Sequence, residues 1–77
     1  MELTEGADPR DAAARLYEEA AAELELAAQH CRTAAGHFRD RNVPRGTAHA
    51  WAAQGHALEA AERLARQSRE HARKSIP

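Results

Sequence analysis

The sequence predicts an all-α fold, an antiparallel two-helix hairpin that homodimerises into a four-helix bundle. Three observations predict it: helical apolar periodicity without any strand pattern, a single cluster of helix breakers, and an apolar content made mostly of alanine. The chain is then one domain. Its expected parts are a flexible lead-in (1–8), a first helix (9–41), a turn (42–46), a second helix (47–74) and a frayed end (75–77).

The first helix has a clear start signal in ADPRDAAARL. Asp8 can cap the helix, Pro9 suits the first helical position, and Asp11 places a negative charge in the first turn. Only Gly36 interrupts the stretch that follows, and an interior glycine costs about 1 kcal/mol relative to alanine. A single long helix is therefore expected.

The turn, residues 42–46, is predicted from the helix breakers in the segment RNVPRG, residues 41–46. Asn42 can end the first helix, Pro44 forbids its continuation, and Gly46 with Thr47 offers a new start. Because so short a connection leaves no room for a crossover, the two helices should run antiparallel.

The first helix carries a heptad pattern in which one seam position is always alanine and the other is larger. Such a smooth face lets a partner helix approach near the lower end of the 8 to 10 Å interaxial range. The seam comprises Ala13, Tyr17, Ala20, Leu24, Ala27, Cys31, Ala34 and Phe38, with Ala14, Ala21, Ala28 and Ala35 beside it.

The second helix has apolar columns on more than one face, so a single hairpin cannot bury all of them. Of the 33 hydrophobic residues, 20 are alanine, which buries little area per side chain. We therefore expect a homodimer. The predicted interface residues are Tyr17, Ala20, Leu24, Ala27, Ala28, Cys31, Phe38, Trp51 and Leu58.

The formal net charge of −1 argues against the basic field of a typical nucleic-acid binder. The acidic first helix and the basic end of the second should pair within the hairpin, with Glu18 opposite Arg69. The arginines near the turn lack such partners and form an anion-binding candidate. They are Arg39, Arg41 and Arg45, with Arg32 close by.

The single cysteine, Cys31, excludes an internal disulfide and is expected to be a buried structural thiol. The acidic N-terminal stretch has no apolar run, so neither a signal peptide nor a membrane span is expected. A cytoplasmic location is the default for such a chain.

Four histidines lie seven residues apart in pairs, His30 with His37 and His49 with His56. Seven residues separate Cα atoms by about 10 Å along a helix, so a metal would have to sit between helices. The heptad phase places His30 and His37 beside the seam and the other two on an outer face. A metal site is the lesser alternative to packing, and no cofactor is expected.

The segment RTAAGH, Arg32 to His37, resembles the Arg-x4-His motif of HEPN domains, all-helical proteins of which many are dimeric ribonucleases. The resemblance covers six residues, and RQSREH, Arg66 to His71, has the same spacing. It implies RNA binding or cleavage by Arg32 and His37 at a dimer cleft. HEPN domains are longer, with additional helices.

Apart from that alternative, no set of residues in the chain predicts catalysis. Cys31 and His30 are neighbours and point to different sides of a helix, and no third group orients them. The function favoured is therefore self-association, or binding of an unidentified protein partner, by a small helical hairpin.

Overall fold

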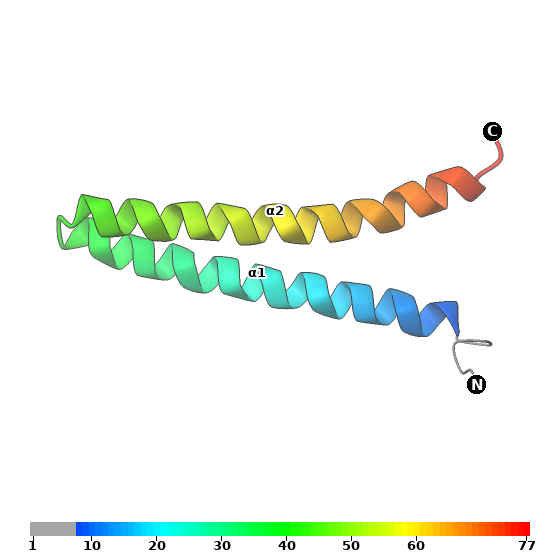
Figure 1. The fold of residues 1–77 in the computed structure, drawn as a ribbon, viewed down its shortest axis with the longest axis horizontal. Coiled ribbons are helices and arrows are strands. Elements are labelled where there is room, and N and C mark those ends of the chain that lie inside the picture. The colour runs from blue at the N-terminus through cyan, green and yellow to red at the C-terminus, as the bar shows by residue number, and fades with distance from the viewer. Residues whose placement is uncertain (1–7) are drawn as a thin grey trace.

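The computed structural model describes residues 8–77, and the lead-in predicted for residues 1–8 lies outside them except for Asp8. Two helices, α1 (Pro9–Arg39) and α2 (Val43–Lys74), run antiparallel and pack against each other (Figure 1). The predicted all-helical hairpin is therefore confirmed.

The start of α1 follows the predicted capping chemistry. The Asp8 side chain accepts a hydrogen bond from the backbone N–H of Arg10, and Pro9 occupies the first turn. The Arg10 guanidinium also donates to both Asp8 carboxylate oxygens. This contact holds the pKa of the Asp8 carboxyl below its usual range, because it favours the ionised form.

The turn is shorter than the sequence predicted. Arg41 adopts a left-handed conformation with φ of 64°, so α1 ends at Arg39 instead of residue 41. The Asn42 N–H donates to the His37 carbonyl and the Arg41 N–H to the Phe38 carbonyl, which is the Schellman arrangement.

The second helix also begins earlier, at Val43 instead of residue 47. The Asn42 side chain accepts from the Arg45 N–H, and Pro44 lies in the first turn, where its missing donor costs nothing. Gly46 therefore lies inside α2 and does not start it. Only Asp40 to Asn42 connect the two helices.

The core consists of small residues. Over residues 8–77, the buried hydrophobic side chains are all alanines. Gly46 is buried beneath the Phe38 ring, to which an added Cβ would approach within 2.9 Å. We call this strip the seam. It comprises Ala20, Ala27 and Ala34 on α1 and Gly46, Ala53 and Ala60 on α2.

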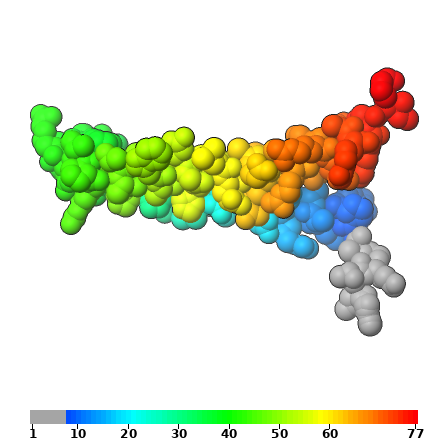
Figure 2. Space-filling view, turned by 45° about the horizontal axis from the view of Figure 1, so that its top comes forward, coloured from blue at the N-terminus to red at the C-terminus, as the bar shows by residue number. Residues whose placement is uncertain are grey.

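The helices lie close at the turn and separate toward the opposite end, which we call the open end. Figure 1 shows this divergence, and Figure 2 shows the C-terminal end of the chain projecting from the hairpin. Neither helix contains a stretch long and apolar enough to cross a bilayer, as judged over residues 8–77.

Candidate functional site

The seam divides the hairpin into two sides of opposite character. Residues three positions after each seam residue project to one side, and residues four positions after it project to the other. The first set is polar on both helices. The second set is apolar on both helices and includes Leu24, Phe38 and Leu64.

The polar side is a row of histidines drawn from both helices. His30 lies between His49 and His56, with ring centroids 5.2 and 5.6 Å away, and His37 stacks on His49 at 5.5 Å. The Nδ1 atoms of His30 and His49 are 2.9 Å apart, so one ring donates a hydrogen bond to the other. All four rings are half-buried.

Charged groups continue this row toward the open end. The His56 Nδ1 lies 2.7 Å from a Glu23 carboxylate oxygen, and Arg63 donates to Glu19 at 2.6 Å. Arg63 also lies 3.5 Å from Glu59. The polar side, defined by these four histidines, Glu19, Glu23, Glu59 and Arg63, is thus largely satisfied within one chain.

The histidine arrangement corrects the sequence analysis. His49 and His56 were expected on an outer face, but they lie against α1 because the packed column of α2 is Gly46, Ala53 and Ala60. The sequence analysis did not identify this column as the packed one. The reason is that histidines and an arginine lie beside it, whereas Trp51 and Leu58 give another face of α2 a stronger apolar pattern.

The expected Glu18–Arg69 pair also does not form. Arg69 pairs with Glu62 at 3.1 Å within α2, and Arg63 is an arginine of α2 that reaches an acid of α1. The earlier start of α2 accounts for the shift, because it brings each α1 level opposite a residue about four positions earlier in α2.

The contacts within the histidine row are pairwise hydrogen bonds, stacking contacts and ion pairs. Over residues 8–77, no group of three or more histidine, cysteine or acidic side chains is placed to hold a metal ion.

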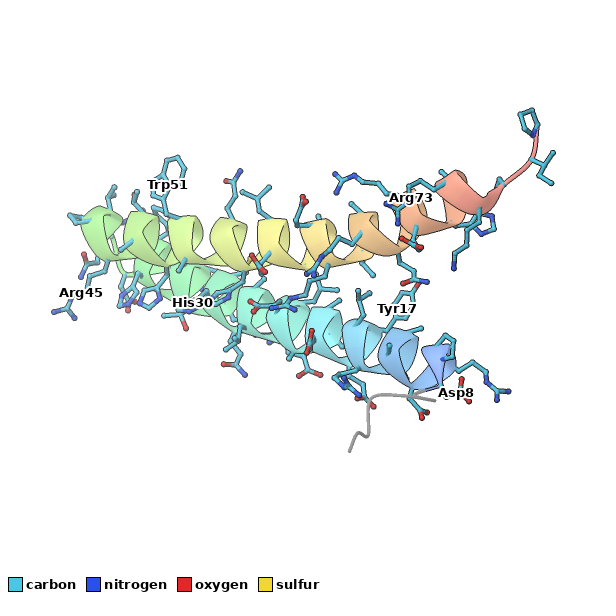
Figure 3. All side chains as sticks on the ribbon, turned by 45° about the vertical axis from the view of Figure 1, so that its right-hand side comes forward. Asp8, Tyr17, His30, Arg45, Trp51 and Arg73 are labelled. Atoms are coloured by element: carbon cyan, nitrogen blue, oxygen red, sulfur yellow. The ribbon has the colours of Figure 1, made fainter. Side chains whose placement is uncertain are left out.

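The apolar side is exposed. Trp51 and Leu58 lie on its outer α2 edge and are 69% and 62% exposed, and Figure 3 shows Trp51 pointing away from α1. The other large exposed members are Tyr17, Leu24, Phe38, Val43 and Leu64. Smaller members are Cys31, Ala50 and Ala57, with Ala21, Ala28 and Ala35 beside them.

The predicted interface residues are divided between these regions. Ala20 and Ala27 lie in the seam between the helices, and Ala28 is half-buried next to it. Cys31 is exposed within one chain and lies on the apolar side. The remaining members of that predicted set lie on the apolar side: Tyr17, Leu24, Phe38, Trp51 and Leu58.

The anion-binding candidates Arg39, Arg41 and Arg45 are all exposed at the turn. Arg32 is exposed on α1, while His37 faces the polar side and stacks on His49. Five residues separate Arg32 from His37, which places them about 140° apart around the helix. Within one chain, their side chains therefore do not converge.

Known proteins offer no relative from which a role could be transferred. No family model, no curated protein and no solved structure matches the chain. The feature that bears on function is therefore the contrast between a polar side that is largely paired within the chain and an apolar side that is exposed.

Proposed function

We propose that this chain is a self-association module, in which two copies bury their apolar sides against each other as a four-helix bundle. The observation that carries the proposal is the composition of the core. A hairpin with two helices of 31 and 32 residues buries only alanine among its hydrophobic side chains.

A core of methyl groups contributes little to folding. Burial stabilises by roughly 25 cal/mol per Å² of apolar surface, and an alanine side chain supplies a small area. Ordering each residue costs about 1 to 2 kcal/mol of backbone entropy. Small domains with so little core usually gain stability through oligomerisation.

The apolar side has the dimensions of a protein interface. Two helices of this length, about 45 Å long and packed about 9 Å apart, present a face of roughly 800 Å². That area per partner is typical of a specific interface. The face also mixes large residues such as Tyr17 and Leu24 with alanines, as interdigitating helices require.

Sedimentation equilibrium with two matched leucine variants tests the proposal. Leu24 lies on the apolar side and is 48% exposed, whereas Leu26 lies two residues away, outside that side, and is 39% exposed. The wild-type chain should sediment at twice its mass of 8.4 kDa. Leu24→Glu should sediment as a monomer, and Leu26→Glu should remain dimeric.

Circular dichroism of the same samples separates loss of association from loss of fold. A wild-type chain that is helical and monomeric at 100 μM would refute the proposal. Equal effects of the two glutamate variants would show that the apolar side is not the interface.

A further inference from the structure

The outer edge of the apolar side on α1 carries an ordered column of four exposed charged residues. Among the residues that the structure describes, none of the four forms an ion pair with another side chain. From the open end toward the turn, the column reads Glu18, Glu25, Arg32 and Arg39.

Within one chain, these four charged side chains are too far apart to form ion pairs with one another. Neighbours in the column are seven residues apart, which separates them by about 10 Å along the axis. A second α1 running in the opposite direction would place Glu18 beside the partner's Arg39 and Glu25 beside the partner's Arg32. The two-fold axis of that arrangement passes between Ala28 and Gln29.

The residues on the outer edge of α2 predict the same two-fold axis independently. His30 lies between His49 and His56, so residue 30 of α1 is level with residues 52 and 53 of α2. The axis at residues 28 and 29 is therefore level with Gln54. Trp51 and Leu58 lie on either side of this point at nearly equal distances, so the axis brings Trp51 onto the partner's Leu58.

In this arrangement the turn of the second copy would occupy a groove at the open end. A cavity of about 350 Å³ opens there between the helices, lined by Tyr17, Gln67, Ser68 and His71. The same axis brings the turn of the second copy to the level of Tyr17. The exposed Phe38 and Val43 at that turn supply the apolar side chains to cover it.

The charges of the two ends favour this direction as well. Residues 29–54, around the turn, carry four arginines and one aspartate, whereas the rest of the chain carries seven basic and eleven acidic residues. If the turn of one copy lay on the turn of the other, two basic ends would come together. If it lay on the open end of the other, a basic end would face an acidic one.

We propose that the two hairpins stack antiparallel, with the turn of each copy on the open end of the other and α1 against the partner's α1. This inference rests on the proposed function, because it specifies the geometry of the same dimer. Its direct contacts are the Glu18–Arg39 and Glu25–Arg32 pairs and the Trp51–Leu58 packing, each made twice.

A charge swap tests the direction of stacking. Glu18→Arg should weaken the dimer about tenfold, because two attractive contacts become repulsive, each exposed pair being worth up to about a factor of five. Adding Arg39→Glu to the same chain should restore wild-type affinity. Turn-on-turn stacking does not place these residues together, so failure of the second change to rescue would overturn the inference.

Distances between spin labels give a second measurement on the intact dimer. In a Cys31→Ser background, single labels at Gln29→Cys should lie within about 25 Å of each other, since residue 29 is next to the axis. Labels at Arg15→Cys should lie about 40 Å apart, because 27 residues of helical rise separate them.

The two measurements distinguish a wrong stacking direction from the absence of a dimer. Short and equal distances at both sites would establish turn-on-turn stacking, which overturns the inference while the dimer stands. A wild-type chain that stays monomeric in the sedimentation experiment removes both. The labelled variants must match the wild-type mass, which controls for the substitutions themselves.

Discussion

The two sides of the hairpin are built from the same helices but satisfy their side chains differently. On the polar side, His30 hydrogen-bonds to His49, and Arg63 donates to Glu19. These polar side chains therefore find their partners between the two helices of one chain. On the apolar side, Trp51 and Leu58 are left exposed. The polar side therefore makes its contacts between the two helices of one chain, whereas the apolar side is the surface on which the proposed dimer depends.

The largest expected effect comes from the seam, on which both sides depend. Ala27→Leu should destabilise the hairpin by about 3 kcal/mol, because a leucine cannot fit where the helices meet at a buried alanine. Ala22→Leu, at an exposed position of the same helix, is the matched control. Thermal unfolding followed by circular dichroism measures both, and equal melting temperatures would mean that the helices do not pack closely there.

Trp51→Ala tests the apolar side alone. The indole is largely exposed within the chain, so its loss should cost about 2 kcal/mol of association and little monomer stability. The melting temperature should therefore fall at high protein concentration and match wild type at concentrations where both dissociate. A decrease that is independent of concentration would place the contacts of the indole within its own chain.

Removal of the central ring of the histidine row tests the polar side. His30 hydrogen-bonds to His49 and stacks on both His49 and His56, so its side chain contacts two residues of α2.

We therefore expect His30→Ala to lower the free energy of unfolding by about 1 kcal/mol, the size of one hydrogen bond. Gln29→Ala, at an exposed position of the same helix, is the matched control. Urea unfolding at neutral pH measures both variants. Equal stabilities of the two variants would show that the histidine row does not contribute to stability.

The smallest effect should come from Asp8, which lies at the end of α1 and belongs to neither side. The Arg10 guanidinium lowers the pKa of its carboxyl in the folded chain. The stabilisation is therefore present above the ordinary value of 3.8 and is lost as the pH falls through the folded value.

Asp8→Ala should thus lower the melting temperature at pH 7, and the gap to wild type should close in acid. Asp8→Asn retains a capping oxygen and should lie between the two. A gap that persists at pH 2 would mean that the carboxylate charge is not its source.

The sequence was sufficient to predict α1 almost completely. Asp8 and Pro9 mark its start, and the alanine column predicted as a seam contains the buried Ala20, Ala27 and Ala34. These features are local, or repeat with the period of a single helix. They therefore do not depend on what the other helix does.

The phase of α2 could not be predicted in the same way. Burial of large apolar residues is the usual guide to the packed face, and here it points to Trp51 and Leu58, which are exposed. The packed face instead carries Gly46, Ala53 and Ala60 beside histidines. Only the contacts across the hairpin, such as His56 with Glu23, reveal that choice.

The uniformity of the seam has a consequence for helix registration. Gly46, Ala53 and Ala60 repeat every seven residues, so sliding α2 by one heptad would replace one small residue with another. Such a slip would leave the energy of the methyl contacts nearly unchanged. The three-residue connection and the ladder of imidazole, carboxylate and guanidinium contacts must therefore fix the alignment, as polar residues do in other coiled coils.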